Sequence, residues 1–532
     1  MQKKIQIKIA AIDSANEQII KSHLAEDAGC LVQAITGYYL LRRSLDARSR
    51  NPQLILTAYV FIDEPVLPRQ TIQQPVLDLS HAPKSVLIIG AGPAGLFAAL
   101  SLIRAGIRPV ILERGKDIRA RRRDLAFLNK KGLINPESNY CYGEGGAGTY
   151  SDGKLYTRSN KRGNTQRILD LFVRFGADEN IFYETHPHIG TNKLPSIIEA
   201  IRTYILECGG EIHFNKKMND WSETRENITE IRTADGDRFR ADAYILATGH
   251  SARDIFHLFH GKKKDIHAKP FALGVRVEHP QELINSIQYH YARECDPRAV
   301  LLPPAAYQLI HTGNKRSIFS FCMCPGGIIA PASTNPSELV VNGWSPSKRN
   351  NPFANSGIVV NIQEKDWQPY SKHGPLAAMF FQASIESIAF QHGGGMFKAP
   401  AQRLTDFISG TISTSLPVCS YGPGIQSADV PSIFPSEIGR SLQDAFTVFG
   451  KKMKGYLTQE AIIVATESRT SSPVRIPRDD ESGAHPQLHN FYPCGEGAGY
   501  AGGIMSAAMD GEFVAEKIAL LMLKKPILHD QT

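Results

Sequence analysis

Three glycines at fixed spacing are the residues of this chain most clearly suited to binding chemistry. Residues 90–95 read Gly-Ala-Gly-Pro-Ala-Gly, the pattern GxGxxG. Gly90 permits a tight turn, Gly92 lets the backbone approach a pyrophosphate, and Gly95 lets a helix pack closely on a strand. With Pro93 and Ala94 between them, these glycines would place the N–H groups of a helix N-terminus against the phosphates of a ligand.

The elements around this pattern make it specific. An apolar strand at Val86–Ile89 leads into the glycines, a helix follows to about Ala105, and a second strand ends at Glu113. Strand, glycine turn, helix, strand and terminal acid together predict a dinucleotide site. Glu113 is placed to accept hydrogen bonds from an adenosine ribose, which suits FAD or NAD and disfavours NADP. We count the adjacent Arg114 with the cofactor-binding residues.

Three further glycine-rich segments follow far downstream. They are residues 139–163, residues 241–254 with the sequence ADAYILATGHSARD, and residues 494–511 with the sequence CGEGAGYAGGIMSAAMDG. Glycine weakens helices and strands by roughly 0.5–1 kcal/mol relative to alanine, so such clusters need a reason. A simple NAD dehydrogenase needs only the first cradle.

The order of these segments resembles the FAD-binding flavoproteins of the glutathione-reductase-like superfamily. Blocks such as GEGGAGTYSDGKL, FALGVRVEHPQELI, ESRTSSPVRI and PCGEGAGYAGGI also resemble a bacterial family of uncharacterised FAD-dependent, or NAD(FAD)-utilising, dehydrogenases. The resemblance implies that the C-terminal segment crosses back to the FAD domain. Its implied cofactor-binding residues are Ala247, Thr248, Gly249, Gly495, Glu496, Gly502, Gly503 and Ile504.

In such flavoproteins the acidic residue, here Glu496, binds the ribitol and pyrophosphate end of FAD, and Gly502 and Gly503 lie beneath the flavin ring. The resemblance implies an FAD-dependent oxidoreductase that transfers hydride through flavin N5 to or from a small-molecule substrate. No second strand–GxGxxG–helix–acid unit follows residue 120. A nicotinamide donor, NADH or NADPH, would therefore bind only transiently, or another reductant would serve.

Other candidates each have two interpretations. Ser151 and Lys154 could contact the pyrophosphate or the flavin edge, or lie in an exposed polar loop. Cys322 and Cys324, two apart on a predicted strand, would face the same way. They could form a redox pair, although a disulfide between residues two apart closes a strained ring and is uncommon. They could also be small buried residues before a turn, the interpretation we favour because free cysteine packs as a small hydrophobe.

Histidines and arginines give weaker signals. His186 and His188 could act as acid or base, or be loop histidines without chemistry. Arg469 and Arg475 could grip an anionic substrate with forked donors, and salt bridges at a domain interface explain them equally well. The basic run at residues 114–131 is typical of a solvated helix face. No metal site is predicted.

The length and composition of the chain indicate the class of protein that carries these motifs. The chain has 532 residues, a net charge of +8 and 42% hydrophobic residues, which is typical of a globular protein of several domains. The mild charge permits acidic ligands and does not by itself indicate nucleic acid. Eight scattered cysteines form no disulfide framework, and no signal peptide or membrane span is evident, so a reducing cytoplasm is expected.

These observations predict an α/β protein. Its Rossmann-like FAD-binding domain would be built from residues 84–254 and 485–527, with an inserted mixed α+β substrate domain at residues 271–475. Residues 1–80 would form a small α/β domain with a basic stretch, LRRSLDARSR. That domain would pack on the enzyme body. In the alternative function, FAD is structural or sensing and the basic domain binds RNA or protein.

Overall fold

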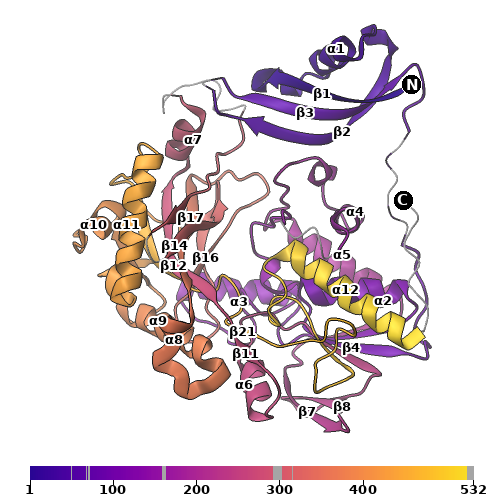
Figure 1. Ribbon diagram of the computed structural model, residues 1–532, viewed down its shortest axis with the longest axis vertical. Coiled ribbons are helices and arrows are strands. Elements are labelled where there is room, and N and C mark those ends of the chain that lie inside the picture. Colours follow the sequence, from indigo (N-terminus) through magenta and orange to yellow (C-terminus); the bar gives the residue numbers. More distant parts are fainter. Residues whose placement is uncertain are drawn as a thin grey trace.

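The computed structural model of the chain is shown as a ribbon in Figure 1. It describes residues 1–532 apart from residues 50, 68, 70, 71, 73, 158–162, 292–301, 314–315 and 524–532.

A parallel sheet of five strands in the order β22-β10-β4-β5-β6 underlies the glycine motifs. Its strands are β4 (Ser85–Ile89), β5 (Arg108–Leu112), β6 (Glu211–His213), β10 (Ala243–Leu246) and β22 (Phe491–Pro493). Strand β10 and nearly all of β4 are buried, as expected for strands covered on both faces. Because β22 pairs with β10, the C-terminal region of the chain completes this sheet.

The helices on this sheet include α2 and α12, which lie side by side in Figure 1. Their contact is close, since a Cβ added at Gly511 of α12 would lie 2.1 Å from the carbonyl oxygen of Ala94 in α2. The helices of this part of the chain are α2 (Pro93–Arg104), α3 (Ile118–Lys131), α4 (Thr165–Arg174), α5 (Leu194–Glu207), α6 (Arg253–Gly261) and α12 (Ile504–Leu523). A small antiparallel sheet joins β7 (Met218–Thr224), β8 (Asn227–Thr233) and β9 (Arg238–Phe239).

The long apolar run at residues 86–103 is divided between two elements. Strand β4 ends at Ile89 and helix α2 begins at Pro93, where proline is well suited to the first helical turn. Within the described part of the chain, no helix combines the length and the apolar composition that a membrane crossing requires.

A second, mostly antiparallel sheet has seven strands in the order β13-β14-β17-β12-β20-β18-β19. They are β12 (Phe271–Pro280), β13 (Ile310–Thr312), β14 (Ser317–Cys324), β17 (Phe353–Ile362), β18 (Ala399–Arg403), β19 (Ile425–Ser427) and β20 (Ile462–Glu467). Side chains of α9 and α11 share one buried apolar core with this sheet. The helices here are α7 (Gln281–Tyr289), α8 (Glu364–Trp367), α9 (Ala377–His392), α10 (Leu404–Ser409) and α11 (Ser436–Lys452).

Two short strand pairs accompany this sheet. Strand β15 (Ile328–Pro331) pairs with β16 (Val341–Trp344), and β11 (His267–Ala268) pairs with β21 (Val474–Arg475). Because β11 precedes the seven-stranded sheet in the chain and β21 follows it, this pair holds together the two points where the chain enters and leaves that sheet.

The N-terminal unit is a three-stranded antiparallel sheet in the order β1-β3-β2 with one helix. Its elements are β1 (Gln2–Ala10), α1 (Glu17–Ala28), β2 (Ile35–Asp46) and β3 (Gln53–Ile62). The backbone N–H of Arg43 donates to the carbonyl of Tyr183 at 2.6 Å, and the Arg43 guanidinium pairs with Glu184 at 2.6 Å. Part of the basic stretch therefore holds the unit against the body, which is the packing we expected.

Candidate functional site

One cavity of about 930 Å³ lies where the glycine-rich segments meet. We call it the central cavity. Its wall includes most of the predicted cofactor residues, namely Gly90, Gly92, Pro93, Ala94, Glu113, Arg114, Ser151, Lys154, Ala247, Thr248, Gly249, Glu496, Gly502, Gly503 and Ile504. Cys322 and Arg469, from the second sheet and its flank, also line it. The volume is at the upper end of the roughly 300–1,000 Å³ typical of ligand pockets.

Glycines of the first cradle and of two later segments let distant parts of the chain lie in direct contact. A Cβ added at Gly90 would lie 2.4 Å from the carbonyl oxygen of Ala247, and one at Gly146 would lie 3.1 Å from the Cα of Gly92. At Gly495 the added atom would meet the Cβ of Ala94 at 2.8 Å. Side chains would therefore push apart the very segments whose backbones form the cavity wall.

Other glycines leave open space at the cavity. A Cβ added at Gly249, Gly502 or Gly503 would meet no protein atom within 4 Å, although all three residues line the central cavity. The absence of side chains there keeps volume free for a ligand and exposes backbone to it. Gly95 is absent from the wall, because it lies against the carbonyl oxygen of Gly90 at the predicted helix–strand contact.

Two helix N-termini open at the cavity. Helix α2 has Gly92 at its N-cap with no side-chain hydrogen bond, and α12 begins at Ile504 directly after Gly502 and Gly503. The N–H groups and the positive end of each helix dipole favour negative charge. The wall can therefore hold two separate sites of negative charge on one elongated ligand.

Glu113 organises the cradle as well as lining it. Its carboxylate accepts hydrogen bonds from the backbone N–H groups of Ala91 at 2.9 Å, Gly115 at 2.8 Å and Gly143 at 3.0 Å. A carboxylate offers about four acceptor positions, so one remains for a ligand hydroxyl. Arg114 is paired with Glu137 and Asp254 and lies over the ring of Tyr142.

The 139–149 loop is held by Arg121, a residue that we assigned to a solvated face. Its side chain is completely buried. The guanidinium donates to five carbonyl groups of the loop, those of Asn139, Tyr140, Gly143, Glu144 and Gly146. The charge pattern of residues 114–131 could not predict this role, because a buried arginine cannot be distinguished in the sequence from exposed arginines beside it. The signal in the sequence was the glycine-rich loop that follows this helix, which needs donors for its carbonyl groups.

The C-terminal acidic residue, Glu496, lines the central cavity. Glu496 approaches within 3.4 Å of the Nδ1 atom of His250, which follows Gly249 in the second glycine segment. Gly495 itself is turned inward, and its N–H donates to the buried carboxylate of Asp510 at 2.7 Å. Asp510, which pairs with Arg478, is thus a positioning residue that sequence reasoning missed.

The cysteine pair does not present two equivalent side chains. The register between β14 and β17 shifts between Phe321 and Cys324, and Cys322 has a φ of 48°. Cys322 therefore lines the cavity, whereas Cys324 is fully buried. Our prediction assumed a regular strand, and the bulge re-aims side chains. Both Sγ atoms nevertheless lie within 4.0 Å of the Nζ atom of Lys154.

The remaining catalytic candidates have structural partners. Arg469 is buried and pairs with Glu386 at 2.9 Å and Glu338 at 3.3 Å, so the salt-bridge interpretation holds for it although it reaches the wall. Burial lowers the pKa of His188 to about 4, and its Nε2 atom lies 3.1 Å from the carbonyl oxygen of Ser347. His188 is thus a neutral structural residue outside the cavity wall. The guanidinium of Arg475 lies over the ring of Tyr500.

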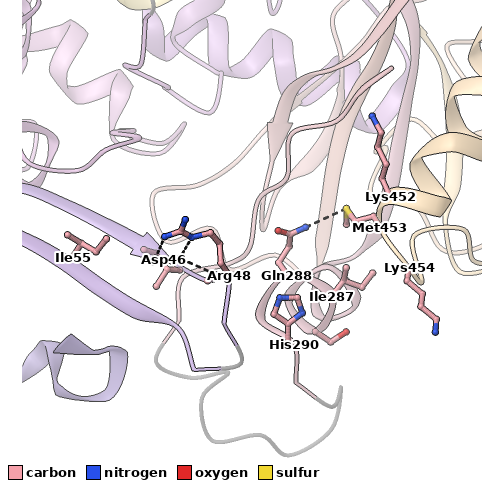
Figure 2. A pocket seen from close by; sticks show the side chains of 12 residues that line it. Asp46, Arg48, Ile55, Ile287, Gln288, His290, Lys452, Met453 and Lys454 are labelled. Carbon is pink, nitrogen blue, oxygen red and sulfur yellow. Dashed lines mark hydrogen bonds and ion pairs between the residues drawn. The ribbon is translucent and has the colours of Figure 1, made fainter. Parts of the chain in front are cut away.

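A second cavity of about 970 Å³ lies between the N-terminal unit and the C-terminal ends of α7 and α11. Figure 2 shows Asp46, Arg48 and Ile55 on one side and, on the other, side chains at the C-terminal ends of α7 and α11 and just beyond them. None of the predicted site residues lines it. Among the described residues, no group of three or more His, Cys, Asp or Glu side chains is arranged to hold a metal ion.

Comparisons with known proteins place the chain. Residues 270–470 match a family model described as "FAD-dependent protein, C-terminal domain-like", residues 84–124 match "FAD binding domain", and residues 1–61 match a domain of unknown function (DUF8436). An uncharacterized protein of Clostridium beijerinckii is 36% identical over 96% of this chain and 97% of its own length. The chain belongs to the same family as that protein. The two matching family models whose descriptions name FAD confirm that this chain is an FAD-dependent flavoprotein.

Further proteins are similar over part of the chain. The thiamine thiazole synthase of Aeropyrum pernix is 27% identical over 32% of this chain and 57% of its own length. Among solved structures, CtdE in complex with FAD aligns over 82% of this chain and 84% of that chain with 12% identity and a TM-score of 0.31. The 2,6-dihydroxypyridine-3-hydroxylase of Arthrobacter nicotinovorans aligns over 83% and 84% with 11% identity and a TM-score of 0.36.

Proposed function

We propose that the protein is an FAD-dependent oxidoreductase that holds FAD in the central cavity and acts on a small molecule. The observation that carries this proposal is the convergence of four glycine-bearing segments, from residues 90–95, 143–148, 247–249 and 495–503, on one cavity. A phosphate cradle alone would suit many nucleotides. The second helix N-terminus, at Ile504, supplies a further site for negative charge that a nucleotide without a second end would not use.

The residues of the wall divide the work of holding FAD. Glu113 would accept a hydrogen bond from the adenosine ribose, and the N-terminus of α2 would face the pyrophosphate. Glu496 would accept from the ribitol end, and Gly502, Gly503 and Ile504 would bring the N-terminus of α12 to the flavin ring. Bound FAD supplies a two-electron acceptor and donor, exchanging hydride through N5. The positive end of α12 would stabilise the charge of the reduced ring.

The substrate would reach the flavin from the side of the second sheet. Phe321 and Cys322 of this sheet and Asn342 of the neighbouring strand β16 line the central cavity there, so they would contribute the surface over the cofactor. We propose residues 84–254 and 485–527 as the FAD-binding domain and residues 271–475 as the substrate domain. This arrangement is similar to that of the glutathione-reductase-like flavoproteins. Because the sequence shows no second dinucleotide cradle, a nicotinamide donor would bind in the same cavity and leave after reduction.

The test starts from the full-length purified protein. We expect it to contain one flavin per chain, identified as FAD after denaturation by its absorption spectrum and chromatographic mobility. Anaerobic mixing with NADH or NADPH should bleach the flavin within seconds, the timescale of ordinary turnover. Protein that stays colourless after incubation with excess FAD would refute the proposal. Bleaching by dithionite but by neither nicotinamide would remove the nicotinamide donor and keep the flavin.

A further inference from the structure

Cys322 occupies a backbone conformation that its own side chain disfavours. Its φ of 48° lies in the left-handed region, which non-glycine residues adopt uncommonly. It sits in the β14 bulge between the pairs Phe321–Gly357 and Cys324–Asn355. Bulges of this kind are found beside functional sites, where they re-aim a side chain. Here the bulge turns a thiol toward the central cavity, although packing alone would be served by a regular strand.

One buried lysine lies between this thiol and its neighbour. The Nζ atom of Lys154 is 3.7 Å from the Sγ atom of Cys322 and 4.0 Å from the Sγ atom of Cys324. It also donates to the carbonyl of Met323 and lies 3.7 Å from Asp152. Asp152 is itself bound by Arg349 at 2.9 Å. The ammonium group is therefore placed at both sulfur atoms and is only partly neutralised by its carboxylate.

A second cation fixes the backbone of the bulge. Arg276, fully buried, donates to the carbonyl of Cys322 at 2.8 Å and lies 3.8 Å from the Sγ atom of Cys324. Its charge is balanced by Glu467 at 2.5 Å. The bulge is thus locked by a buried ion pair on one side and by Lys154 on the other, which preorganises the position of both sulfur atoms.

The two thiols have opposite tendencies to ionise. A hydrogen bond from Cys324, together with the charges of Lys154 and Arg276, lowers the pKa of Cys322 below its usual range. The same hydrogen bond and burial raise the pKa of Cys324, whose Sγ atom lies 3.2 Å from the carbonyl oxygen of Cys322. A thiolate is the nucleophilic form of cysteine, so the geometry presents a reactive sulfur at the cavity and a protonated partner next to it.

We propose that Cys322 and Cys324 form a dithiol–disulfide pair that exchanges an electron pair with the flavin in the central cavity. This inference rests on the proposed function, which supplies the flavin. In the oxidising direction the Cys322 thiolate and the Cys324 thiol lose two electrons and one proton as the sulfur–sulfur bond forms. The oxidised flavin takes up those two electrons and one proton. A dithiol or disulfide is therefore the class of substrate that this cavity would pass electrons to or from.

The first experiment detects the disulfide without relying on the flavin. Full-length protein is oxidised with diamide, treated with iodoacetamide and digested, and the peptide with both cysteines is examined by mass spectrometry. We expect that peptide to be unlabelled and to lack two hydrogens, and to carry two labels after prior reduction. Labelling of both cysteines in the diamide-treated protein would overturn the proposal.

The second experiment counts electrons in the flavin-loaded protein. Anaerobic titration of the oxidised protein with dithionite should consume about two electron pairs per flavin, because a disulfide is itself a two-electron couple. The Cys322→Ser and Cys324→Ser variants should consume about one pair, and Cys30→Ser, in the N-terminal unit, should consume about two. A wild-type protein that consumes only one pair would overturn the proposal. If the protein binds no flavin, the proposed function and its exchange with the pair both fail, while the mass measurement still reports whether the pair exists.

A third measurement tests the role assigned to Lys154. In Lys154→Met, iodoacetamide should alkylate Cys322 about tenfold more slowly at neutral pH, since a smaller fraction of the thiol is ionised. Lys116→Met, which removes a lysine paired with Asp124, is the matched control and should leave the rate unchanged. Equal rates in Lys154→Met and the wild type would show that the ammonium does not act on the thiol.

Discussion

Replacing Arg121 with methionine should release the 139–149 loop from the central cavity. The side chain is completely buried, and its guanidinium donates to five loop carbonyls, so methionine would keep much of the volume and remove every donor. At roughly 1 kcal/mol for each bond, the loop loses about 5 kcal/mol of local stability before relaxation. Water entering the loop would recover part of this.

The loss should appear as faster local opening. A change of about 1.4 kcal/mol is tenfold in an equilibrium constant, so even about 3 kcal/mol accelerates amide exchange by more than about a hundredfold. The amide of Gly145, bound to the carbonyl of Ala91 at 2.8 Å, and that of Glu144, bound to the carbonyl of Lys116 at 3.0 Å, report on it directly. Hydrogen exchange with mass spectrometry on peptides covering residues 139–149 is the assay.

Arg122 provides the matched control, because it lies exposed on the same helix. Arg122→Met should leave loop exchange and flavin content as in the wild type. Arg121→Met should also retain less flavin, since the loop carries Gly146 against Gly92 of the cradle. If the loop of Arg121→Met exchanged no faster than that of Arg122→Met, the buried arginine would not be what positions this wall.

Three further outcomes follow from the same geometry. Gly502→Val should fold normally but bind FAD much more weakly in a fluorescence titration, because its added atoms enter open cavity space. The control is Gly261→Val, which also has no atom within 4 Å of an added Cβ but does not line the cavity. It should bind FAD as the wild type does. Glu113→Gln should weaken FAD binding about tenfold or more, because an amide cannot accept from all three backbone N–H groups that the carboxylate binds. Charged hydrogen bonds contribute roughly 1.5–3 kcal/mol each. Wild-type affinity measured by calorimetry would contradict this prediction. The lowered pKa of His188, about 4, means that the folded state binds its proton less readily than the unfolded state, so this residue should cost stability as the pH falls from about 6.5 to 4, by up to about 3 kcal/mol. His188→Gln should therefore flatten the acid side of the melting-temperature profile, and an unchanged profile would show that another group controls it.

The first cradle could be predicted from the sequence because all its determinants are local. Strand β4, the turn at Gly90, helix α2 and strand β5 ending before Glu113 follow one another within a short stretch, and each residue's role follows from backbone geometry. The resemblance to FAD-dependent proteins, which the family models confirm as a flavoprotein assignment, rested on the order of motifs along the whole chain.

Properties that depend on neighbours from other elements were decided only by the tertiary structure. Arg121 is the same residue type as its neighbours Arg122 and Arg123, and it is buried because α3 packs against the 139–149 loop. Cys322 and Cys324 differ because β14 bulges against β17, a register that no local spacing specifies. Arg469 lines the central cavity and pairs with the carboxylates of Glu338 and Glu386, which come from distant parts of the chain. Consecutive residues determine local backbone conformation, so the sequence predicts it. Burial and charge pairing depend on segments that come together only when the chain folds.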